Sequence, residues 1–263
     1  MESDSDAVIA ECNQSIQRIH DMLQRNPQDW RGYINLARSL TSSIDRTDFM
    51  TTPNRVREQT WIISTLQHLA YQEPDEGGVR DIAEWCVAQW LQVLQNNPED
   101  VETLQGLGQS WLSLAQRLIA NIHREDGSSS SSGSLLNHRV NTSTSSIIYT
   151  ASDDERDNVQ ATVDADSRLH NADYVEARGM LLPATDFFRR AVDIAEARGL
   201  VTGELLALAA EAFMSLGNVS YSSVNEHHFR QALDYLGRAT RVPSYQLPSY
   251  LQHYLHEYGR LLN

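Results

Sequence analysis

Apolar side chains recur at helical spacing along most of the chain. The clearest stretch lies between Asn97 and Leu118, and its apolar side consists of Leu104, Leu107, Trp111, Leu114 and Leu118. Asn97-Pro98 ends the preceding helix, and the acids that follow suit the positive end of a new one. Because Gly106 and Gly108 lower helix stability, we expect another helix to pack here too closely for a side chain.

The same spacing predicts further helices separated by Pro and Gly, over residues 8–25, 28–40, 54–72, 79–95, 174–198, 203–217, 229–239 and 248–262. Pro183 interrupts the 174–198 stretch, which therefore reads as one helix or two. Short turns between amphipathic helices are typical of antiparallel helical arrays. We therefore predict an all-α fold.

A polar stretch rich in Ser and Asp interrupts this pattern over residues 125–168. Its composition predicts a mostly disordered insertion between helical parts at 1–124 and 169–263. Ser152 precedes three acids, a charge pattern that acidophilic kinases favour, so phosphorylation there is a further hypothesis.

Composition fits an ordinary folded protein of 263 residues with 41% hydrophobic content. No apolar run approaches the roughly 18–20 residues of a membrane span, and the first residues are acidic where a secretory signal would be basic. We therefore expect an intracellular protein, cytoplasmic or nuclear. Cys12 and Cys86 lie far apart in helical patterns, so we expect buried free thiols.

The net charge of −14 disfavours nucleic-acid binding, because phosphate backbones are bound by clustered basic side chains. The longest basic run here is Arg189-Arg190. An acidic surface suits a partner protein with basic segments.

Every one of the 21 basic residues is arginine, and the chain contains no lysine. Schiff-base chemistry, a phosphate-loop lysine and a lysine general base are therefore excluded. Two explanations stay open: codon bias or drift, and avoidance of lysine near a lysine-modifying system such as ubiquitin conjugation.

The recurring pattern of large and small residues resembles the tetratricopeptide repeat (TPR). The best match is Leu104, Leu107, Gly108 and Trp111 after Pro98, and weaker copies begin at Tyr33 and Leu205. The resemblance covers about two-thirds of the chain. It implies a TPR-like α-solenoid, and a scaffold or adaptor that binds a peptide or helix of another protein in a groove, such as an assembly factor or complex subunit.

Five residues are candidate partner contacts. Of the places where some TPR proteins hold a carboxylate, only that of Arg38 carries a suitable side chain, so a carboxylate clamp is not expected. Trp30 and Trp85 lie beside their helices' apolar stripes and suggest exposed anchors. Gln105 and Gln109 lie on the polar side of the 97–118 helix.

The alternative is a helical enzyme. His253 and His256 lie one turn apart near Glu257, with His227-His228 upstream, as a metal hydrolase would need. The segment Asn26-Pro27-Gln28-Asp29-Trp30 resembles a repeat of prenyltransferase alpha subunits. No phosphate loop, Gly-x-Ser-x-Gly or Cys-x-x-Cys motif is present, and we predict no enzyme activity, cofactor or metal.

Overall fold

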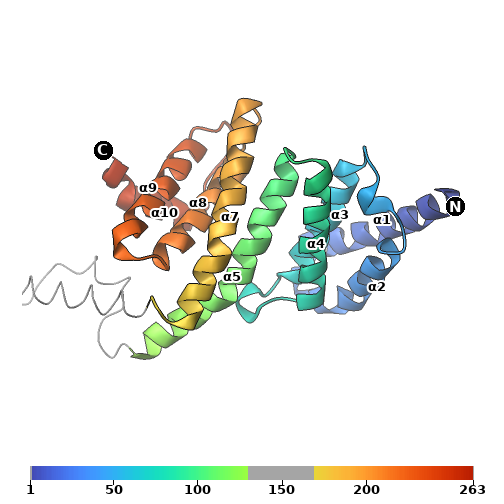
Figure 1. Cartoon of the computed structure of the whole chain (residues 1–263), viewed down its shortest axis with the longest axis horizontal. Helices are drawn as coiled ribbons and strands as arrows, with labels where there is room; N and C mark the ends of the chain where they lie inside the picture. Colours follow the sequence, from blue (N-terminus) through green and yellow to red (C-terminus); the bar gives the residue numbers. More distant parts are fainter. Residues whose placement is uncertain (1, 130–168, 263) are drawn as a thin grey trace, which may run out of the picture.

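The computed structural model describes residues 2–129 and 169–262, and every regular element within these ranges is helical (Figure 1). The α-helices are α1 (Glu2–Arg25), α2 (Ile34–Ile44), α3 (Val56–Ala70), α4 (Arg80–Asn96), α5 (Val101–Ser129), α7 (Ala172–Ala197), α8 (Gly203–Asn218), α9 (Ser222–Ala239) and α10 (Ser249–Tyr258). Short 3-10 helices are η1 (Pro27–Tyr33), η2 (Phe49–Thr51), η3 (Pro74–Glu76) and η4 (Gly259–Leu262). The predicted all-α class is confirmed for this part of the chain.

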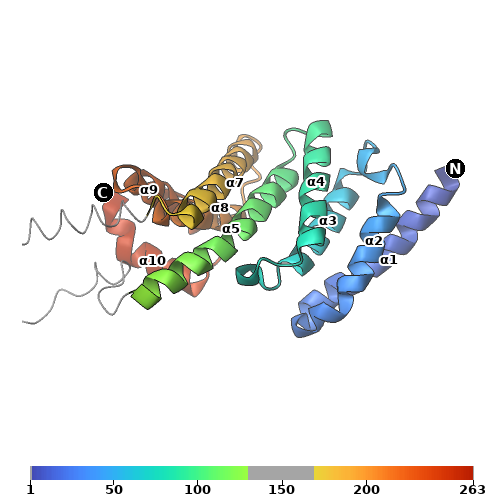
Figure 2. The same ribbon diagram turned by 60° about the horizontal axis from the view of Figure 1, so that its bottom comes forward.

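Helices α1 to α9 follow one another along the long axis of the molecule in chain order, and α10 folds back beside α8 and α9 (Figures 1 and 2). Helix α1 contacts α2 and α3, α3 contacts α4 and α5, and α5 contacts α7. Helix α8 then contacts α7 and α9, while α10 contacts α9. Contacts are therefore mainly between helices close in sequence, which is the packing expected of stacked helical hairpins.

Two hydrophobic cores meet at α5. One core contains buried side chains of α1 to α4 together with Leu107 of α5. The other joins Leu104, Leu112, Leu118 and Ile122 of α5 to helices α7–α10. Helix α5 belongs to the predicted 1–124 part, yet most of its apolar side packs with helices of the 169–263 part.

A buried hydrogen-bond network explains the glycine at position 106. The Gln67 side chain of α3 donates to the carbonyl oxygen of Gly106 over 3.2 Å. Its own amide oxygen accepts from the Trp90 indole N–H and from the Ser110 hydroxyl, each over 2.6 Å. The Trp90 ring lies against α5 at this point, and a Cβ at position 106 would come within 2.5 Å of it. The two glycines mark two different crossings, because a Cβ at position 108 would instead lie 2.9 Å from the Phe188 ring of α7.

The segments differ from the sequence prediction at several places, and α9 begins at Ser222 where the predicted helix began at residue 229. The second helix starts as the 3-10 helix η1 and becomes α-helical only at Ile34. Helix α5 continues to Ser129, so residues 125–129 are helical where disorder was predicted. Pro183 lies inside a continuous α7, which resolves the choice between one helix and two. The rest of the predicted insertion, with the Ser152 site, lies outside the described residues.

The C-terminal segment docks on α8 through aromatic and leucine side chains. Tyr245 covers Gly203, where a Cβ would lie 2.1 Å from the ring. Leu247 and Leu251 are buried, and the Tyr250 hydroxyl donates to the Glu211 carboxylate. The last helix is thereby fixed against the preceding hairpin.

Candidate partner-binding face

One side of α3 and α5 carries accessible, mostly polar side chains at helical spacing. We call it the α3–α5 face, and it consists of Arg57, Trp61, Ser64, His68, Glu102, Gln105, Gln109 and Ser113. The opposite sides of both helices are buried in the cores. Glu102 interacts with Arg57 and Thr60, so the two helices present this face on the same side.

Gln105 and Gln109 lie at the centre of this face and are both half-buried. Neither side-chain amide has a hydrogen-bond partner among the described residues. An amide offers two N–H donors and a carbonyl acceptor, the complement of a peptide group. These glutamines are the two predicted site residues that the structure brings together.

Two ionisable side chains on this face, Glu102 and His68, have shifted pKa values. Desolvation raises the pKa of the Glu102 carboxyl above its ordinary value, and the interactions with Thr60 and Arg57 only partly oppose it. Desolvation also lowers the pKa of His68, and the neighbouring His20 of α1 lowers it further. Both shifts are in the direction of the neutral form of the side chain.

Helix α1 adds the aromatic ring of His20 to this face. The His20 ring lies 6.5 Å from the Trp61 ring, in a tilted arrangement. Trp61 is only half-buried. Its spacing of three and seven residues from Ser64 and His68 is the sequence signal for its accessible position.

The other three predicted site residues lie elsewhere. Trp30 of η1 is 8% exposed and packs in the N-terminal core, unlike the exposed anchor that its position suggested. Arg38 forms a two-point ion pair with Asp81 that joins α2 to α4. The half-buried Trp85 packs against the same core and donates to Asp45 over 2.8 Å. Each of the three therefore has a partner within the chain.

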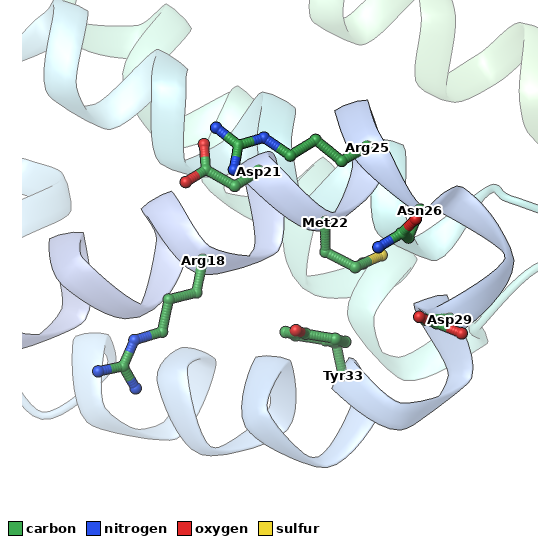
Figure 3. Close-up of a pocket in the computed structure, with 7 residues that line it drawn as sticks. All are labelled: Arg18, Asp21, Met22, Arg25, Asn26, Asp29 and Tyr33. Carbon is green, nitrogen blue, oxygen red and sulfur yellow. The ribbon is translucent and has the colours of Figure 1, made fainter.

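A separate depression of about 240 Å³ lies at the N-terminal end of the array (Figure 3). It is lined by Arg18, Asp21, Met22, Arg25, Asn26, Asp29 and Tyr33. Figure 3 shows two arginines and two aspartates spread around Tyr33, so the charges balance. Polar side chains of this kind suit the outer surface of a terminal helical pair.

The cysteines and histidines were the candidates for chemistry. Cys12 and Cys86 are free and buried, as predicted, and burial raises the pKa of both thiols. His253 lies 3.6 Å from Glu257 on α10. Within residues 2–129 and 169–262, no three His, Cys, Asp or Glu side chains cluster as metal ligands would.

Comparisons with models of known families, with characterised proteins and with solved structures gave no match. None of the helices in the described ranges is long and apolar enough to cross a membrane.

Proposed function

We propose that this chain is a non-enzymatic, TPR-like helical scaffold that binds a peptide or helix of a partner protein on its α3–α5 face. The order of helix contacts, hairpin after hairpin, supports the repeat architecture. The buried free thiols support a reducing, intracellular location, in the cytoplasm or the nucleus.

The observation that carries this proposal is the pair of glutamines at the centre of the face, Gln105 and Gln109, whose side chains have no hydrogen-bond partner among the described residues. Their amide groups remain accessible to water and form no hydrogen bond with the described residues, so they can bind a partner. A partner's main chain can supply a donor and an acceptor to each of them. Trp61 beside them adds an aromatic surface of the kind enriched at interfaces.

The test compares two matched double variants by affinity purification of the full chain from native cells. Gln105→Arg with Gln109→Arg places two long charged side chains on the α3–α5 face. The control, Gln92→Arg with Gln95→Arg, makes the same change on accessible positions of α4. We expect only the variant at positions 105 and 109 to lose its specific partner. The thermal unfolding midpoints of both variants should stay close to that of the parent.

Retention of the same partners by the variant at positions 105 and 109, with an unchanged fold, would contradict the proposal. Trp85→Ala separates packing from contact in the same assay. Reduced stability identifies a core side chain, whereas lost binding at parental stability identifies a partner contact.

A further inference from the structure

The complete absence of lysine is too improbable to be an accident of ordinary composition. Lysine is normally one of the commonest residues, and 21 even choices would all give arginine with a chance of about one in two million. Nucleotide bias does not explain it. Lysine and asparagine codons share their first two bases, and the chain contains 14 asparagines.

The structure requires a guanidinium at some positions. Arg178 donates to the carbonyl oxygens of Val219 and Leu169 over 2.7 and 2.8 Å, and lies 4.9 Å from the centre of the Tyr221 ring. Arg38 holds both carboxylate oxygens of Asp81. A lysine ammonium cannot reproduce this planar, forked geometry, so arginine is explained at these sites.

Other arginines make no contact that requires a guanidinium. The side chains of Arg18, Arg25 and Arg241 are exposed, and no residue in the described ranges forms a hydrogen bond or ion pair with them. A lysine would supply the same charge and solubility there. Packing therefore does not account for the absence of lysine.

The property that distinguishes lysine at an exposed site is a primary amine that can act as a nucleophile. We propose that this chain works within reach of a ubiquitin-conjugating enzyme and that the absence of lysine from it protects it from modification. In that transfer a neutral ε-amine attacks the thioester carbonyl that joins ubiquitin to the enzyme. An isopeptide bond forms, the carbon–sulfur bond breaks, and the amine's proton leaves with the thiol. A guanidinium stays protonated and does not complete this step.

The inference does not depend on the α3–α5 face, and its test leaves that face unchanged. The 263-residue chain is expressed in native cells with Arg18→Lys and Arg241→Lys together. The control carries Arg18→Gln and Arg241→Gln, which remove the charge without adding an amine. Half-lives are measured after protein synthesis is stopped, and adducts are mapped by mass spectrometry.

We expect the lysine variant to have a several-fold shorter half-life and a ubiquitin adduct at position 18 or 241. Inhibition of the ubiquitin-activating enzyme restores the parental half-life, and the glutamine control keeps it throughout. Thermal unfolding of the purified variants checks that the fold is unchanged. If the lysine substitution at position 18 or 241 changes the fold, Arg25→Lys is used in its place. A lysine variant as long-lived as the parent and free of adducts overturns the inference.

Discussion

Gly106→Ala tests the packing of α3, α4 and α5 at its tightest point. The new Cβ would lie 2.5 Å from two atoms of the Trp90 ring and 2.9 Å from a third. Favourable carbon contacts begin at about 3.5 Å, so the overlap is about 1 Å. The helix itself would gain roughly 0.5–1 kcal/mol from alanine. Overpacking of a buried site costs about 1–3 kcal/mol and sometimes more.

The overlap is not easily relieved, because Trp90 is fully buried and its indole N–H is bonded to Gln67. Moving the ring would cost that hydrogen bond, and α5 cannot retreat without opening the second core on its other side. We therefore expect Gly106→Ala to lower the free energy of unfolding by about 1–3 kcal/mol despite the better helix former.

Gly179→Ala is the matched control. Gly179 is exposed in the middle of α7, and a Cβ there would meet no atom within 4 Å. Because only the higher helix propensity of alanine over glycine acts at this position, we expect the free energy of unfolding to rise by about 0.5–1 kcal/mol.

Urea unfolding followed by circular dichroism measures both variants against the parent. The expected result is a midpoint that falls for position 106 and rises for position 179. A rise in both midpoints would refute the reasoning, because it would mean that Trp90 does not limit the space at Gly106.

Two further predictions concern buried polar groups. Gln67→Leu should lower the free energy of unfolding by about 2 kcal/mol, since the Trp90 indole N–H loses its acceptor inside the core; stability equal to the parent's in urea unfolding would show that the network adds nothing. Burial raises the pKa of Glu211 to about 7, so the folded state binds a proton more tightly than the unfolded state. Stability should therefore fall as pH rises from about 4.5 to 7, and Glu211→Gln, which still accepts from Tyr250, should flatten that slope in thermal unfolding. An identical slope in parent and variant would contradict this assignment.

Most helices could be predicted from the sequence because their apolar residues follow a 3.6-residue period. Prolines and glycines fixed the ends of α3 and α4 to within a few residues. Pro183 was ambiguous, because a proline inside a helix is tolerated only where packing compensates for it. The ring of Phe188, one turn further on, is buried against α5, which supplies such packing.

Pairing between helices was harder to predict than the helices themselves. Gly106 showed that some helix packs closely against α5, but period and composition do not specify that the contact is Trp90. The reason is that the ring is positioned by Gln67 on a third helix, 23 residues from Trp90 and 39 residues from Gly106 in sequence.

The candidate site was predicted in part. Gln105 and Gln109 were identifiable because the polar side of an amphipathic helix can be located from its apolar side. Trp30 and Trp85 were ambiguous, since a tryptophan beside an apolar stripe can fill a core or meet a partner. Arg38 has its partner Asp81 on another helix, a contact that local sequence does not encode.

Site-specific photo-crosslinking tests the central claim most directly. A benzophenone side chain replaces Gln109 on the α3–α5 face or, as the control, Gln95 on the exposed side of α4. After irradiation of native cells, we predict one dominant protein adduct from position 109 and no matching adduct from position 95. Equal adducts from both positions, or none from position 109, would contradict a partner-binding role for this face.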